Sequence, residues 1–182
     1  HKGNAGTLIR VSKNQYSTIF RSSTIRQNWT KADLENFSLA FRAAELLGVS
    51  RKSFLKTLLK LKGLEGRREF VADIKGVTFI NDTTATNPNT ALNTLRFFAR
   101  GKTDLIVIAG GVDKKLDFED FVRGLERFAK AVIFLPGDAS EKMKKLFSTQ
   151  SRSKIKEVYS MPEAVRLSFQ MAQGGDSVIL LP

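Results

Sequence analysis

Residues 105–111 read LIVIAGG, a run of five apolar residues that ends in two glycines. A continuous apolar run flanked by amphipathic helical segments predicts a strand that is buried on both faces of a sheet. The same alternation continues along the chain. Strands are expected at 104–109, 131–135, 155–159 and 177–181, and helices at about 89–99, 117–129, 139–147 and 162–173. This order of elements is typical of an α/β fold with a mostly parallel sheet covered by helices on both faces.

The residues before this alternation follow other patterns. Residues 69–74 and 77–80, separated by Lys75-Gly76, predict a β-hairpin, and residues 7–20 alternate polar and apolar side chains as two short strands would. Between them, two amphipathic helices are expected. The first has Thr30 as its N-cap and runs to Gly48, and the second starts at Ser50 and carries Phe54, Leu58 and Leu61 on one face.

Composition limits the chemistry that the chain can perform. It has 182 residues, of which 42% are hydrophobic, with no Cys and a single His at position 1. Disulfides, thiolate zinc sites and Cys nucleophiles are therefore excluded, and histidine chemistry has only the terminal His1. No apolar run approaches the roughly 20 residues that a membrane span needs. Any reaction must use Asp, Glu, Lys, Arg, Thr, Asn or backbone groups.

The net charge is +12, and it is uneven along the chain. Residues 1–70 contain 14 Lys and Arg against 5 Asp and Glu, a net charge of +9, and residues 71–182 have a net charge of +3. A basic half of this kind indicates an anionic partner, such as nucleic acid, a membrane surface or a phosphorylated ligand. It is equally compatible with a solvated basic surface. Because the chain begins without Met and ends just after an apolar strand, we also expect it to be part of a longer protein.

In a doubly wound sheet, ligands bind at the loops that leave the carboxyl ends of the strands. The first such loop, residues 81–88, reads NDTTATNP. Its carboxylate, Asp82, is suited to ribose hydroxyls or to water-bound Mg²⁺, and its Thr hydroxyls can donate to phosphate or carboxylate. Ordinary capping of the next helix by Thr86 or Asn87, with Pro88 at its first position, explains part of the segment equally well.

Two further loops leave the same edge of the expected sheet. Residues 110–118 read GGVDKKLDF, in which two glycines allow close approach of a ligand and Lys114 offers a cation for an anion. A tight turn with two solvated lysines is the alternative. The third loop, residues 136–138, is expected to be only a turn.

Two positions outside these loops are also candidates. Arg67 and Arg68 lie where the helical segment meets the hairpin, and they are suited either to an anion contact or to plain solvation. Asn36 is a weak helix former within a helical run. It is compatible either with a ligand contact or with an ordinary polar helix position.

Five segments together resemble the Mur ligases, within which they are most similar to the branch that adds D-glutamate. These are residues 31–36 (KADLEN), 63–69 (GLEGRRE), 80–88 (INDTTATNP), 110–118 (GGVDKKLDF) and 175–182 (GDSVILLP). The resemblance covers residues 31–182. It implies that residues 1–64 are the end of the central ATP-binding domain and that 65–182 are most of a Rossmann-like C-terminal domain, truncated at its end.

The resemblance also implies a reaction. ATP, with Mg²⁺ held mostly by residues outside this chain, would phosphorylate the carboxylate of UDP-N-acetylmuramoyl-L-alanine, and the amine of D-glutamate would attack the acyl phosphate. Asn36 would contact adenine, Arg67 the ATP phosphates and Asp82 the ribose, while Thr86 and Lys114 would bind the D-glutamate carboxylates. Such an enzyme serves peptidoglycan synthesis, and hence cell shape and division. It would be a cytoplasmic monomer without membrane or nucleic-acid partners.

Several positions depart from the family pattern. Thr84 replaces a common Lys, which removes a cation from the phosphate contacts, and Gly66 replaces the His before Arg67. Ala32 and Asp33 stand where a His-Asn pair is usual, and Leu181 where Ser is usual. No P-loop motif occurs in the 182 residues, so we expect this chain alone not to catalyse ligation.

Two alternatives remain open from the sequence. One is another amide ligase of the same superfamily, acting on folate or cyanophycin. The other is a basic module that binds nucleotides or nucleic acid without catalysis, for which the pattern of aromatic residues is unfavourable because they follow core spacing.

Overall fold

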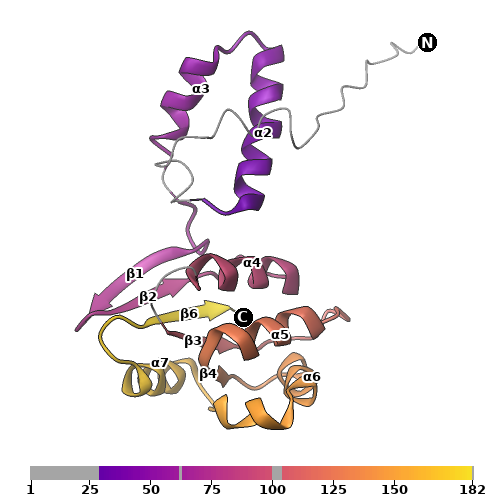
Figure 1. The fold of residues 1–182 in the computed structure, drawn as a ribbon, viewed down its shortest axis with the longest axis vertical. Coiled ribbons are helices and arrows are strands. Elements are labelled where there is room, and N and C mark those ends of the chain that lie inside the picture. The colour runs from indigo at the N-terminus through magenta and orange to yellow at the C-terminus, as the bar shows by residue number, and fades with distance from the viewer. Residues whose placement is uncertain (1–28, 62, 100–103, 182) are drawn as a thin grey trace. The chain divides into compact units, whose positions relative to one another are not determined.

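The computed structural model describes residues 29–61, 63–99 and 104–181 of the chain. Their helices and strands are drawn in Figure 1. The chain divides into two compact units, residues 1–62 and 63–182. The two strands expected within residues 7–20 lie outside the described residues.

The described part of the first unit is a pair of helices, as the sequence predicts. Helix α2 (Lys31–Leu46) begins with a capping box, in which the amide of Asp33 donates to the Thr30 hydroxyl (3.1 Å) and the amide of Thr30 donates to the Asp33 carboxylate (2.8 Å). Helix α3 (Arg51–Leu58) has Ser50 as its N-cap. Phe41 and Leu58 form the buried centre of this unit.

The prediction that Leu61 lies on the apolar face of the second helix is wrong. Helix α3 ends at Leu58, and the amides of Lys60 and Leu61 donate to Thr57 and Leu58 in i→i−3 hydrogen bonds of 3.0 and 3.2 Å. Such bonds wind the chain more tightly than an α-helix, so the next residues leave the apolar face. Leu61 is 49% exposed.

The second unit is built on a six-stranded sheet in the order β1-β2-β6-β3-β4-β5. Its strands are β1 (Glu69–Ile74), β2 (Val77–Asn81), β3 (Leu105–Ala109), β4 (Ala129–Phe134), β5 (Ile155–Glu157) and β6 (Ser177–Leu181). Strand β1 pairs antiparallel with β2, and every other neighbouring pair is parallel. The α/β fold, its mostly parallel sheet and the hairpin are thereby confirmed.

Helices cover both faces of this sheet (Figure 1). Their bounds are α4 (Pro88–Phe98), α5 (Glu119–Phe128), α6 (Asp138–Leu146) and α7 (Met161–Met171). Residues of α4, α5 and α6 share one core cluster with alternate strand residues, whereas α7 packs with the cluster on the other face. Strand β3 divides accordingly, with Leu105 and Val107 on the first face and Ile106 and Ile108 on the second.

The burial of β3 explains why its apolar run is continuous. All five of its residues are at most 2% exposed. Burying a Val, Leu or Ile side chain fully contributes about 1.5–3 kcal/mol, so both faces of this strand stabilise the fold. No helix in the described part of the chain is long and apolar enough to cross a membrane.

The region around β5 differs most from expectation. A 3₁₀ helix, Thr149–Lys154, precedes it, and the strand itself has only three residues. The ammonium group of Lys154 donates to the carbonyl oxygens of Glu126 (2.6 Å) and Ala129 (2.9 Å). These hydrogen bonds join residues far apart in the sequence and hold the chain just before β5. Because they produce no local hydrophobic periodicity, the sequence pattern did not predict the 3₁₀ helix.

Candidate functional site

A cavity of about 320 Å³ opens at the carboxyl edge of the sheet, between the loops that follow β2 and β3. Its floor is apolar, with side chains drawn from four elements and both loops. Among the floor residues are Ala85, Ala91, Phe118, Phe121, Met143 and Leu181. The described cavity therefore lies where ligands bind in open α/β sheets.

Two of the residues that the sequence analysis singled out as carboxylate-binding, Thr86 and Lys114, line this cavity together. Thr86 comes from the loop after β2 and Lys114 from the loop after β3, and both are exposed. Within residues 29–61, 63–99 and 104–181, no side chain pairs with the ammonium group of Lys114. A cation and a hydroxyl at the mouth of a pocket are suited to bind a carboxylate or phosphate.

The capping interpretation of the first loop is also confirmed, for Asn87. Its side-chain oxygen accepts a hydrogen bond from the amide of Thr90 (2.9 Å), and Pro88 occupies the first turn of α4. Thr86 is thus not needed as the cap, and its hydroxyl stays with the cavity.

Asp82 lies at the end of β2 but faces inward. It is 1% exposed; its Oδ1 accepts from the amide of Arg68 (3.0 Å), and its Oδ2 accepts from the hydroxyl of Thr94 on α4. The carboxylate therefore ties the Arg67–Arg68 segment to α4. A ribose contact would require one of these oxygens to accept a second hydrogen bond, which the lone pairs of a carboxylate allow.

Thr84 and Gly66 connect the same two segments. The amide of Thr84 donates to the carbonyl oxygen of Gly66 (2.9 Å). Gly66 has a φ of +67°, and a Cβ atom there would lie 2.7 Å from the hydroxyl oxygen of Thr83. The turn therefore favours glycine at this position. Thr84 is exposed and does not line the cavity with Lys114.

Arg67 is half-buried in a second, shallower hollow of about 460 Å³ that residues 63–70 form. The turn that carries it is braced by Glu69, whose carboxylate accepts from the amide of Gly66 (2.9 Å) and from the side chain of Asn81 (3.3 Å). The neighbouring Arg68 stacks over the Phe97 ring at 5.3 Å. This hollow is separate from the cavity that Lys114 lines.

Asn36 belongs to the other unit. It lies on α2 and is exposed, so its weak helix propensity is tolerated without a buried partner. The structure thus brings Thr86 and Lys114 of the second unit into one pocket.

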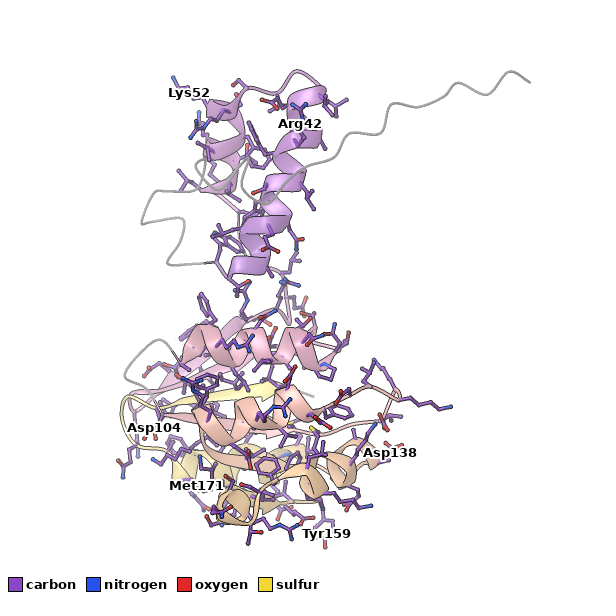
Figure 2. The ribbon with its side chains drawn as sticks, turned by 45° about the vertical axis from the view of Figure 1, so that its right-hand side comes forward. Arg42, Lys52, Asp104, Asp138, Tyr159 and Met171 are labelled. Carbon is purple, nitrogen blue, oxygen red and sulfur yellow. The ribbon has the colours of Figure 1, made fainter. Side chains whose placement is uncertain are left out.

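Residues 136–138 form a short turn, as expected, and this turn also contacts the second loop. Gly137 packs directly on the backbone of Gly111, where a Cβ atom would overlap the carbonyl oxygen of Gly111 and lie 3.0 Å from its carbonyl carbon. The carboxylate of Asp138 accepts a hydrogen bond from the amide of Asp113 (2.7 Å). In Figure 2, Asp138 lies across the second unit from Asp104, which precedes β3 at the amino edge. The third loop therefore supports the Lys114 loop.

Sequence reasoning also missed Lys142 on α6. Its ammonium group donates to Asp113 Oδ2 (3.1 Å) and to the carbonyl oxygen of Leu116 (2.7 Å). The hydrogen bond from Lys142 is the main cause that holds the pKa of the Asp113 carboxyl below its ordinary value. The one sequence feature that could have pointed to Lys142 is that α6 begins directly after a loop at the carboxyl edge of the sheet.

Metal ligands are scarce in the part of the chain that the structure describes. It contains no group of three or more His, Cys, Asp or Glu residues that could hold a metal ion. That the Mg²⁺ ligands lie mostly outside this chain stays a prediction.

The mostly parallel sheet, with a cavity lined by Thr86 and Lys114 at its carboxyl edge, defines a Rossmann-like α/β domain. The family model described as "Mur ligase, glutamate ligase domain" matches residues 66–182, and the chain belongs to this family.

Curated relatives agree with this assignment. The UDP-N-acetylmuramoylalanine–D-glutamate ligase of Caldanaerobacter subterraneus subsp. tengcongensis is 37% identical over 152 residues, which cover 82% of this chain and 33% of the relative. That of Chloroherpeton thalassium is 33% identical over 175 residues, covering 94% of this chain and 34% of the relative. The chain thus spans about a third of the length of these relatives.

Solved structures share the fold at low identity. UDP-N-acetylmuramate–alanine ligase MurC of Thermotoga maritima has a TM-score of 0.65 at 16% identity, covering 84% of this chain and 34% of its own. MurF ligase of Thermotoga maritima, in complex with ADP, has a TM-score of 0.64 at 19% identity, with coverages of 84% and 35%. Folylpolyglutamate synthase of Thermotoga maritima has a TM-score of 0.53 at 22% identity, with coverages of 81% and 35%.

Proposed function

We propose that this chain is part of an ATP-dependent ligase that joins D-glutamate to UDP-N-acetylmuramoyl-L-alanine in peptidoglycan precursor synthesis. In this reaction ATP phosphorylates the carboxylate of the muramoyl-alanine substrate, the D-glutamate amine attacks the acyl carbon, and phosphate leaves as the amide forms. The names of the curated relatives support this substrate pair. The proposal places the enzyme in the cytoplasm as a monomer that serves cell-wall biogenesis and division.

The observation that carries the proposal is the meeting of Thr86 and Lys114 in one cavity. Lys114 supplies a positive charge and Thr86 a hydroxyl donor, and the two come from neighbouring loops of a rigid sheet. Such an arrangement binds and orients a dicarboxylate such as D-glutamate, so that its amine is presented for attack. Catalysis by this domain is then positioning and charge stabilisation, which needs no His or Cys.

The nucleotide roles of Arg67, Asp82 and Asn36 are further proposals that come from the resemblance, and charge and exposure to a hollow support that of Arg67. Arg67, in its own hollow, is suited to contact the phosphates of ATP through its guanidinium group. Asp82 would accept a ribose hydroxyl in addition to its two present donors, and Asn36 would contact adenine. Because Thr84 carries no charge, the phosphate contacts depend on Arg67 more heavily than in relatives that have Lys at that position.

Titration of the 182-residue chain with D-glutamate by isothermal calorimetry tests the proposal. Lys114→Met should weaken binding by about tenfold, the size expected for loss of one charge-assisted hydrogen bond. Lys115→Met is the matched control, because Lys115 is also exposed but does not line the cavity. Equal effects of the two substitutions, or no binding by the wild-type chain, would overturn the proposal.

A second candidate is a ligase of the folylpolyglutamate-synthase type, which the fold likeness to that enzyme of Thermotoga maritima favours. The same titration separates the two candidates when it is repeated with L-glutamate. The D-glutamate proposal expects tighter binding of the D-enantiomer, and tighter binding of L-glutamate would favour this alternative.

A further inference from the structure

One side chain of helix α6, that of Lys142, makes several contacts with the loop that carries Lys114. Lys142 contacts this loop at three points: Asp113 through its carboxylate, Leu116 through its carbonyl oxygen, and Phe118 through the face of its ring, whose centroid is 5.3 Å from the ammonium nitrogen. Asp113 precedes Lys114 in the loop, and Leu116 and Phe118 follow it. The cation of Lys142 therefore holds the loop on both sides of Lys114.

The first turn of α6 adds a second attachment. Asp138 accepts from the amide of Asp113, and the amide of Ala139 donates to the carbonyl oxygen of Gly111 (3.3 Å). The amide of Leu116 in turn donates to the Asp113 carboxylate (3.3 Å). Asp113 thus receives hydrogen bonds from its own loop and from Lys142, while its backbone is held by Asp138.

The pairing of Asp113 with Lys142 also matters for charge. Asp113 directly precedes Lys114, and at neutral pH it is a carboxylate. An unpaired carboxylate at this place would attract the Lys114 ammonium group and repel an anionic ligand in the adjacent cavity. Lys142 compensates this charge from the side of the loop that faces α6, and Lys114 stays at the cavity.

We propose that Lys142 is a positioning residue for Lys114. Lys142 fixes the loop at residues 113–118 and neutralises the charge of Asp113, so that Lys114 can receive a carboxylate. The identity of that carboxylate, D-glutamate, rests on the proposed function. The attachment of the loop to α6 does not.

The test compares four variants of the 182-residue chain: Lys142→Met, Lys142→Arg, Asp113→Asn and the double variant Lys142→Met with Asp113→Asn. Lys145→Met on the same helix is the matched control, because Lys145 is exposed and no described side chain pairs with it. Two quantities are measured: the Kd for D-glutamate, and hydrogen exchange at the amides of Asp113 and Leu116. Circular dichroism verifies that each variant is folded.

Lys142→Met should raise the Kd roughly tenfold and speed exchange at the two loop amides by about tenfold, while Lys142→Arg and Lys145→Met stay within about threefold of wild type. In the Asp113→Asn background, Lys142→Met should weaken binding by less than about threefold, since the charge to be neutralised is gone. Lys142→Arg keeps binding near that of wild type because Arg retains the positive charge and the hydrogen-bond donors. If Lys142 acted by packing alone, this difference between the Arg and Met variants would not be expected.

Unchanged loop exchange in Lys142→Met, or failure of Lys142→Arg to restore binding, would overturn the inference. If the wild-type chain does not bind D-glutamate, the proposed function fails, and the exchange data alone decide the inference. Faster exchange confined to the loop then supports Lys142 as its anchor, and exchange equal to that of Lys145→Met refutes it.

Discussion

Gly137→Ala tests how closely the two glycine loops depend on each other. Gly137 has φ +155° and ψ 156°, a region that only glycine adopts freely, and a Cβ atom would overlap the Gly111 carbonyl group. Forcing a residue into such a region costs about 1–3 kcal/mol. Overpacking adds about 1–3 kcal/mol, and here the obstacle is backbone, which cannot rotate away. We therefore expect a loss of roughly 2–6 kcal/mol in the free energy of unfolding.

Urea unfolding of the 182-residue chain, followed by far-ultraviolet circular dichroism, measures this loss. In a thermal scan of the same signal, the melting temperature should fall by on the order of 10 °C. Gly174→Ala is the matched control, since a Cβ there would lie 3.7 Å from the carbonyl oxygen of Lys75, an ordinary contact without a strained φ. If Gly137→Ala is as stable as Gly174→Ala, the close approach of the two loops is not what requires glycine, and the reasoning fails.

Three further predictions concern Asp82, Asp113 and Lys114. Thr94→Val removes the hydroxyl that donates to the buried Asp82 carboxylate and should cost about 1–3 kcal/mol of stability in urea unfolding, while Thr94→Ser, which keeps the donor, should cost less. Because pairing with Lys142 lowers the pKa of Asp113 from 3.8, this carboxylate stabilises the fold above that pH, and the contribution disappears as the pH falls through the lowered value. The stability difference between wild type and Lys142→Met should accordingly shrink on acidification below about pH 4, and a difference that is constant with pH would contradict the assignment. In the full-length ligase, Lys114→Ala should raise the KM for D-glutamate much more than that for ATP, and equal effects would exclude the carboxylate role.

The fold was largely predictable because its strands carry the signal themselves. The run at 105–109 is apolar on both faces, and its burial on both sides of the sheet is what that pattern requires. The cap at Thr30, and a cap at Thr86 or Asn87, were likewise predictable locally, because a capping side chain acts within three residues of its own position. The 3₁₀ helix before β5 was not, since Lys154 is held by carbonyl groups 25 and 28 residues away.

The site was predictable only where loop position determines it. Thr86 and Lys114 follow strands whose carboxyl ends share one edge, and topology alone brings them together. The burial of Asp82 depends on Thr94, twelve residues along the chain, and the support from Asp138 and Lys142 depends on contacts of 25 residues or more. A polar residue in a loop has the same appearance in sequence whether it faces a ligand or braces the backbone.

The central claim is that one carboxylate site is formed jointly by the loops after β2 and β3. Titration of the ¹⁵N-labelled chain with D-glutamate, followed by amide chemical-shift mapping, tests it most directly. We expect the perturbed amides to fall in both 83–87 and 110–116, with the same apparent Kd, and to lose their response in Lys114→Met. Perturbations confined to one loop, or centred on the hollow at 63–70, would contradict it.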